Sequence, residues 1–127
     1  MGQVVNTMAK KINIQDKLSL FNDHWNPRII AELNKQHVKL AKIKGEFIWH
    51  KHDEEDEMFL VLKGTLKIAF RDKTETINEN EIIIVPKGVE HRPIAEEEVS
   101  IMLFEPATTI NTGDLYNERT RKNLESL

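Results

Sequence analysis

The sequence predicts one all-β domain, a sandwich or jelly-roll barrel, preceded by a short helix. After residue 27, short runs rich in β-branched and aromatic residues alternate with Gly, Asn, Asp and Pro, as is typical of successive strands and turns. In one run Leu66, Ile68 and Phe70 alternate with Lys67 and Arg71, which is the two-residue period of a strand with one buried face. A chain of 127 residues, 39% of them apolar, is long enough for one hydrophobic core and short for two.

The first 27 residues are expected to form an N-terminal arm that contains one short helix. The spacing of Ile14, Leu18 and Phe21 predicts an amphipathic helix over this stretch, with Asn13 as its N-cap. A polar break that ends at Pro27 separates this helix from the first strand.

The barrel is expected to span residues 28–106. We place its eight strands at residues 28–33, 37–43, 47–52, 57–62, 65–71, 73–77, 81–85 and 99–105. Residues 107–127 show little periodicity apart from a weak helical pattern near 117–124. We expect them to form a peripheral tail that packs on the barrel or on a partner subunit.

Composition excludes several classes of function. Eighteen basic and 21 acidic residues give a net charge of -3, and no stretch gathers enough Lys and Arg to bind nucleic acid. No segment has the length and apolarity of a signal peptide or a membrane span, so we expect a cytoplasmic protein without a membrane partner. Because the chain has no cysteine, any metal site must use imidazole and carboxylate ligands.

Three histidines and one glutamate have the spacing of a metal site. His50 and His52 are two residues apart, so on a strand both imidazoles point to the same face. Glu57 opens the next strand after a polar turn, and His91 can return from a different strand after the Pro86–Gly88 turn. Alone, each of these residues is more often structural or solvated, and only the joint pattern indicates a metal.

Such a ligand set suits a divalent transition metal with open coordination positions. Three neutral imidazoles and one carboxylate leave two positions free in a six-coordinate site, where water, dioxygen or an anionic oxygen can bind. Ligand type does not distinguish Fe, Mn, Ni, Zn and Cu. The other two histidines, His24 and His37, lie outside the pattern and are expected to be structural or solvated.

Two stretches resemble the two motifs of the cupin family: G-x4-H-x-H-x4-E-x6-G over residues 45–64, and P-x-G-x2-H over residues 86–91. The resemblance is to small single-domain cupins, and it implies a jelly-roll barrel with His50, His52, Glu57 and His91 as metal ligands. The chain departs from the family pattern in its loops. The first motif has four residues instead of five before its first histidine, Asn80 replaces a glycine, and Ala95 replaces an asparagine.

Strand parity predicts the walls of the pocket around the ligands. If His50 and His52 face inward on a strand, then Ile48 does too, and Phe59 and Val61 face inward on the strand of Glu57. Arg92 and Arg28 are candidate anchors for an anionic ligand, although a surface ion pair is the ordinary role of an arginine.

Three functions stay open at this point. The first is a metal-dependent oxygenase, isomerase or lyase that acts on a small oxygen-containing substrate, such as a sugar phosphate or an oxidisable organic acid. The second is a non-enzymatic module that binds a small ligand or the metal, since no general base beyond the ligands is evident. A metal-free sugar epimerase ranks last because the ligand set is complete.

We also expect a homodimer that pairs through the outer sheets, where the strand at residues 82–85 is apolar on both faces.

Overall fold

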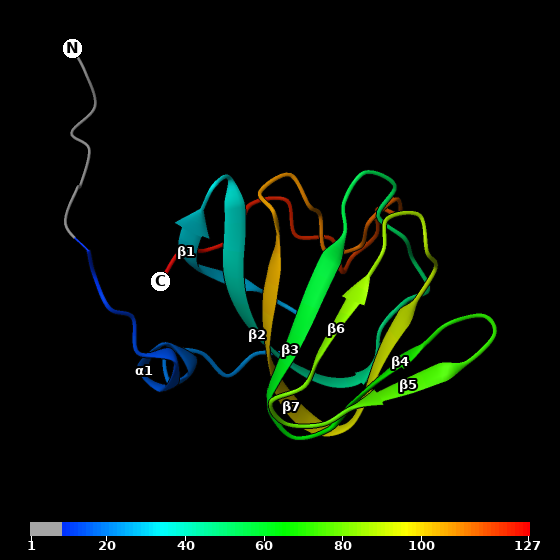
Figure 1. Ribbon diagram of the computed structural model, residues 1–127, viewed down its shortest axis with the longest axis horizontal. Coiled ribbons are helices and arrows are strands. Elements are labelled where there is room, and N and C mark those ends of the chain that lie inside the picture. Colours follow the sequence, from blue (N-terminus) through cyan, green and yellow to red (C-terminus); the bar gives the residue numbers. More distant parts are fainter. Residues whose placement is uncertain (1–8) are drawn as a thin grey trace, which may run out of the picture.

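Seven antiparallel strands and one short helix make up residues 9–127, the part of the chain that the computed structural model describes (Figure 1). The first eight residues of the expected N-terminal arm lie outside the described part. The elements in chain order are α1 (Ile14–Leu18), β1 (Arg28–Leu33), β2 (Gln36–Glu46), β3 (Glu57–Lys63), β4 (Leu66–Ala69), β5 (Thr74–Ile77), β6 (Ile82–Val85) and β7 (Arg92–Pro106). The predicted all-β jelly roll with one short helix is therefore confirmed. Within residues 9–127 no helix is both long and apolar enough to cross a bilayer.

The helix begins as predicted but ends earlier. The Asn13 side chain accepts a hydrogen bond from the Asp16 backbone N–H at 2.9 Å, which caps the first turn. At the other end the Lys42 ammonium donates to the carbonyls of Leu18 and Phe21, at 2.8 and 2.7 Å. Because this side chain from β2 satisfies those carbonyls, the chain leaves the helix after Leu18.

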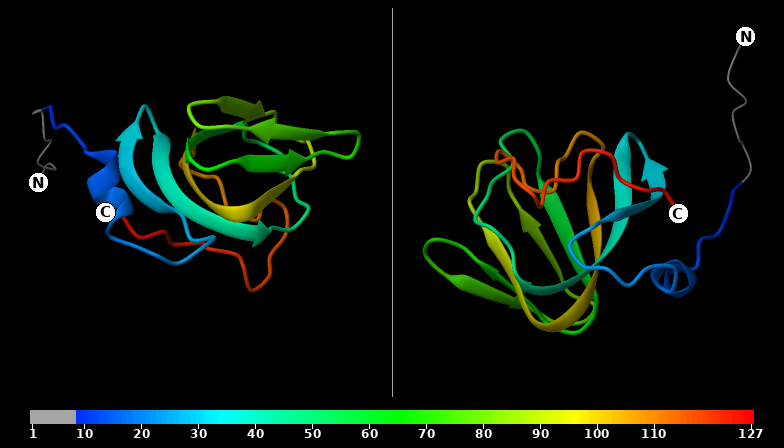
Figure 2. Two further views of the ribbon diagram at one scale, coloured as in Figure 1. Left: turned by 90° about the horizontal axis from the view of Figure 1, so that it is seen from below. Right: turned by 180° about the vertical axis from the view of Figure 1, so that it is seen from behind.

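β7 is the strand that connects all parts of the barrel sheet. Its C-terminal half lies between β2 and β3, in the order β1-β2-β7-β3-β6. Its first residues pair with β4, which pairs with β5, and with the end of β2. Phe59, Val61, Ile68, Ile101 and Leu103 belong to the buried apolar cluster inside the barrel. Figure 2 shows the strands wrapped round this interior.

Three strand predictions differ from the structure. Residues 47–52 do not form a strand and make only one isolated bridge, between His50 and His91. β2 continues to Glu46. Its pairing register with β7 shifts between Ile43 and Gly45, where Gly45 has φ +88°, and the strand continues beyond this shift. β7 begins at Arg92 instead of residue 99. The prediction missed its first part because the exposed acidic residues 96–98 resemble a loop in sequence.

The tail packs on the chain's own barrel without forming the weak helix expected near 117–124. Local bonds compete with a helix there, since Asn117 N–H is bonded to the Thr120 hydroxyl and Arg119 N–H to the Asn117 side chain. The tail ends beside β1, where Leu127 N–H donates to the Ile29 carbonyl at 2.9 Å. The orange-to-red segment in the right panel of Figure 2 follows this path.

Candidate metal centre

Backbone hydrogen bonds join the segment that carries His50 and His52 to the one that carries His91. His50 N–H donates to the His91 carbonyl at 3.1 Å, and His91 N–H donates to the His50 carbonyl at 2.9 Å. Gly88 N–H donates to the His52 carbonyl at 2.8 Å, which holds the turn before His91 against the same segment. Glu57 is the first residue of β3. Three separate segments thus deliver four side chains to one place.

The four side chains form one buried cluster. The candidate ligand atoms of His50, His52, Glu57 and His91 all lie within 4.8 Å of one another, and none of these residues is more than 4% exposed. Two donors bound to one transition metal at about 2.1 Å each lie at most ~4.2 Å apart. Small side-chain movements therefore bring all four onto a single ion.

The tautomers of His50 and His91 leave the nitrogen that faces the cluster free to bind a cation. The Nδ1 of His50 lies 2.9 Å from the Ile48 carbonyl, and the Nδ1 of His91 lies 3.0 Å from the Val89 carbonyl. A carbonyl only accepts, so each Nδ1 donates its proton there and each ring can offer its Nε2 to a cation. The Nε2 of His91 faces a Glu57 oxygen at 3.3 Å. A carboxylate oxygen only accepts, so a proton or a metal ion must lie between it and this nitrogen.

His52 provides the clearest sign that a group is needed at this place. Its ring is 3% exposed, and neither ring nitrogen has a hydrogen-bond partner among residues 9–127. Its Nε2 lies 3.4 Å from the same Glu57 oxygen. A buried polar group without a partner costs roughly 1–3 kcal/mol, and a bound metal ion would remove that cost for Nε2. The residues present therefore fit a divalent metal ion.

Burial and mutual charge perturb the ionisation of these residues. Burial, reinforced by the neighbouring His91, lowers the pKa of His50 to about 4, so this ring is neutral at physiological pH. Burial also acts to lower the pKa of His52, but the adjoining Glu57 carboxylate outweighs it and raises that pKa. Burial alone would raise the pKa of Glu57, yet the neighbouring His52 and His91 hold it well below its usual range. A metal ion binds a carboxylate and neutral imidazoles, so its binding would release any proton that His52 shares with Glu57.

A small cavity adjoins the cluster at His50 and Glu57. Its volume is about 40 Å³, room for roughly three water molecules at ~10–15 Å³ each. Trp25 from the N-terminal arm and Leu124 from the tail are among the residues that line it. The wall is mainly apolar and includes Ala41, Ile43, Phe47, Phe59, Ile101 and Leu103.

The fold and the ligand cluster agree with the comparison to known families. The family model for the cupin domain matches residues 36–105, which is more than half of the chain. The chain belongs to the cupin family. This confirms the resemblance seen in the two sequence motifs.

Relatives of this cupin match most of its length. The uncharacterized protein YdbB of Bacillus subtilis (strain 168) is 37% identical over 93 residues, which are 72% of this chain and 76% of YdbB. A crystal structure of a cupin-2 domain containing protein from Shewanella frigidimarina NCIMB 400 has 56% identity and a TM-score of 0.74, covering 75% of this chain and 93% of that one. Protein NMB1881 of Neisseria meningitidis has 33% identity and a TM-score of 0.71, covering 76% of this chain and 99% of that one.

A buried ion pair in the cavity wall of this cupin was missed by sequence reasoning. The Lys39 ammonium donates to a Glu105 oxygen at 2.8 Å, both residues are 2% exposed, and both line the cavity with Glu57. Burial and the nearby Glu57 carboxylate raise the pKa of Glu105 well above its usual range, against the opposing effect of Lys39. Charged residues on the inward face of β2 and β7 were the available signal, since both positions lie among apolar neighbours in the sequence.

Of the three expected pocket residues, only Phe59 lines the cavity. Val61 lies in the apolar cluster of the barrel instead, and Ile48 is half-buried outside the cavity lining. Phe47 takes the place expected for Ile48, because residues 47–49 are irregular and strand parity does not apply to them. Val61 does face the barrel interior, as predicted, but neither Val61 nor Ile48 is among the residues that line the cavity.

Neither expected anion anchor is among the described residues that line the cavity. Arg28 is bonded to Asp23 and to the Asn26 carbonyl. Arg92 lies 3.6 Å from a Glu46 carboxylate oxygen and over the Trp49 ring. These contacts are structural, and they correct the expectation that either arginine faces the ligand site.

The two remaining histidines also lie apart from the cluster. His24 lies 2.7 Å from a Glu98 oxygen, and His37 lies 3.3 Å from a Glu32 oxygen. Neither His24 nor His37 is part of the cavity lining among residues 9–127.

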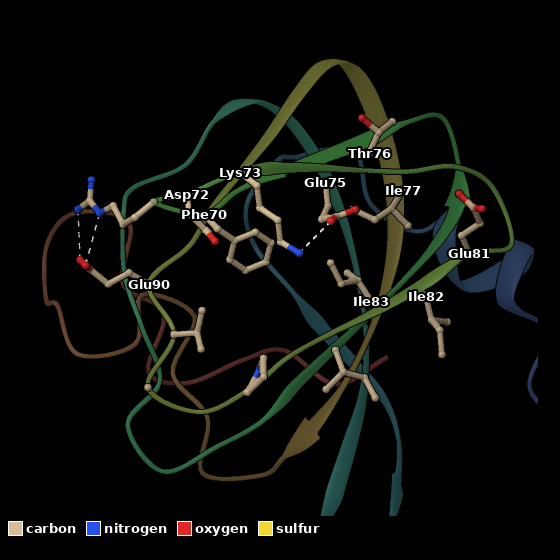
Figure 3. A pocket seen from close by; sticks show the side chains of 15 residues that line it. Phe70, Asp72, Lys73, Glu75, Thr76, Ile77, Glu81, Ile82, Ile83 and Glu90 are labelled. Carbon is tan, nitrogen blue, oxygen red and sulfur yellow. Dashed lines mark hydrogen bonds and ion pairs between the residues drawn. The ribbon is translucent and has the colours of Figure 1, made fainter.

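A larger groove lies outside the barrel, between the β4–β5 hairpin and β6 (Figure 3). Its volume is about 760 Å³, and none of the four clustered residues lines it. Arg71 pairs with Glu90 and Lys73 pairs with Glu75, so these charges already have partners. The small cavity beside the cluster is therefore the better candidate for the site.

Proposed function

We propose that this cupin holds one divalent transition metal ion on His50, His52, Glu57 and His91 and is an enzyme for a small oxygen-containing substrate. The observation that carries the proposal is the pair of unpartnered nitrogens on buried His52, next to a Glu57 carboxylate that also faces the Nε2 of His91. The bound ion would act as a Lewis acid that polarises an oxygen of the substrate. Fe, Mn, Ni, Zn and Cu all suit these ligands.

The test of the metal site is elemental analysis of the purified protein together with metal titration of the metal-free form. Wild type should bind close to one equivalent, and His52→Ala should lower the affinity at least about tenfold. His37→Ala removes a histidine outside the cluster and is the matched control. A wild-type protein that binds no transition metal and gains no thermal stability from one would refute the site.

The cavity narrows the class of substrate. A volume of about 40 Å³ is too small for a sugar phosphate, so among the substrates considered a short organic acid fits better. Apolar side chains such as Phe59 and Leu103 would exclude bulk water from the reacting group. The test is a panel of short keto and hydroxy acids, with and without oxygen, on the metal-loaded protein.

A non-enzymatic metal or ligand-binding module is the second candidate, because the cavity has room for only about three water molecules. A cobalt-substituted protein whose spectrum does not change with any small ligand, and which turns over no compound of the panel, would favour this candidate.

We also propose that the protein is a cytoplasmic homodimer. Ile82 and Ile84 on β6 are 57% and 56% exposed, and burial of such side chains against a second copy would stabilise a dimer. Light scattering at micromolar concentration should give about twice the mass of the 14.8 kDa chain. A monomeric mass would contradict the dimer.

A further inference from the structure

Among the described residues that line the small cavity beside the cluster, Lys39 is the one lysine or arginine. It lies on β2 and is 2% exposed, and Glu105 accepts a hydrogen bond from its ammonium at 2.8 Å. An ammonium has three N–H donors, and the bond to Glu105 is the hydrogen bond it makes within residues 9–127. The second oxygen of Glu105 has no partner in the same part of the chain.

A buried ion pair such as that of Lys39 and Glu105 is not explained by a gain in the stability of the fold. Removal of each charge from water costs several kcal/mol, and apolar residues of similar volume at the same positions often stabilise a protein more. The pair also lies in a wall that is otherwise mainly apolar. These facts favour a role for Lys39 in what the cavity binds.

The charge of the cavity supports the same view, provided that the metal of the proposed function is present. A divalent ion with three neutral imidazoles and Glu57 leaves one positive charge. Lys39 adds a second, against at most one negative charge on Glu105. The cavity therefore carries at least +1 in a low-dielectric setting, where a monoanion is strongly favoured.

The size and wall of the cavity limit that monoanion. A volume of about 40 Å³ holds roughly three to four non-hydrogen atoms. Ala41, Ile43, Ile101 and Leu103 offer no hydrogen bonds to its far end. A dianion such as phosphate would leave oxygens unpaired against these side chains.

We infer that Lys39 is the residue that selects a short monocarboxylate as the ligand of this cavity, by donating to the carboxylate while the apolar wall receives the alkyl end. The inference rests on the proposed function, because the ion supplies part of the positive charge. It places the anion anchor on β2, at a position that neither Arg28 nor Arg92 reaches.

The test uses acetate as the probe and the absorption spectrum of the cobalt-loaded full chain as the readout. Glu105→Gln keeps the ammonium, whereas Lys39→Met with Glu105→Gln removes both charges and leaves no unpaired ion that would unfold the barrel. Lys44→Met is the matched control, since it removes a lysine from an exposed position of the same strand. Cobalt affinity is measured first for every variant.

Wild type, Glu105→Gln and Lys44→Met should bind acetate, and the double variant should bind it about 10- to 100-fold more weakly at unchanged cobalt affinity. Equal acetate affinity in the double variant would overturn the inference, as would equal weakening by Glu105→Gln alone. Loss of cobalt from the double variant would also overturn it, because Lys39 would then act on the ligands. Wild type that holds cobalt but does not respond to acetate refutes this inference alone, whereas wild type that holds no cobalt refutes the proposed function.

Discussion

Gly113 of the tail lies directly against the backbone of Lys51, the residue between His50 and His52. A Cβ atom at position 113 would lie 2.1 Å from the Lys51 carbonyl oxygen, and the glycine has φ +61°. The neighbouring Asp114 bonds to both the N–H and the carbonyl of Lys51, at 3.2 and 3.0 Å. The tail thus holds the segment that presents two of the candidate ligands.

Gly113→Ala should therefore lower metal affinity, by about tenfold or more, because the turn or the ligand segment must move to relieve the clash. The measurement is a competitive titration with a metal chelator. Gly45→Ala is the control, since φ there is +88° but nothing lies within 4 Å of the added atom. It should cost roughly 1–2 kcal/mol of stability from strain and leave metal affinity nearly unchanged. Equal effects of the two variants would contradict a positioning role for the tail.

His52→Leu should abolish the stabilisation of the protein by metal, because it removes one of the four candidate ligands. The metal-free variant should also be less stable than wild type, because Leu leaves the buried Glu57 carboxylate without the ring that lies 3.4 Å away and helps to hold its pKa low. Thermal unfolding with and without metal measures both effects. A metal-free variant as stable as wild type would show that the contact between His52 and Glu57 contributes nothing to stability.

Lys39→Met should destabilise the protein by about 3 kcal/mol, because it leaves Glu105 buried without its partner. Lys39→Met together with Glu105→Leu should recover most of that loss. Urea unfolding of the metal-free forms measures the free energies. Lys67→Met breaks an exposed pair with Glu96 and should cost less than about 1 kcal/mol. A loss in Lys39→Met no larger than that of Lys67→Met would contradict burial of the charge.

His50 should remain neutral in the metal-free protein until the pH falls to about 4. Its pKa is below the unfolded value of 6.5, so between these pH values the folded state binds fewer protons than the unfolded state. Stability must then fall as the pH is lowered from 6.5 towards 4, by at most about 3 kcal/mol from this residue. An NMR titration of the His50 ring measures the pKa. A midpoint near 6.5 would disprove it.

The strands and the ligand cluster were predicted from the spacing of residues that lie near one another in the sequence. The clustering of His50, His52, Glu57 and His91 follows from two motifs, each of which is short and local in the chain. Asn80, which departs from the family glycine, adopts φ +66°, a conformation that asparagine tolerates, so the turn survives the substitution. Strand bounds near Gly45 and residues 96–98 were wrong, because a register shift and an exposed bend leave no clear periodic signal.

The sequence by itself determined the all-β fold and the identity of the clustered side chains, because strand periodicity and ligand spacing are properties of neighbouring residues. Only the tertiary structure decided what surrounds the cluster. Phe47 replaces Ile48 in the wall, Leu124 of the tail lines the cavity, and Lys39 with Glu105 replaces the expected arginines in its lining. The placement of Lys39 and Glu105 depends on pairing between β2 and β7, where Lys39 lies opposite Leu103 and Glu105 lies opposite His37. No local pattern encodes such contacts, since they arise from how the whole barrel closes.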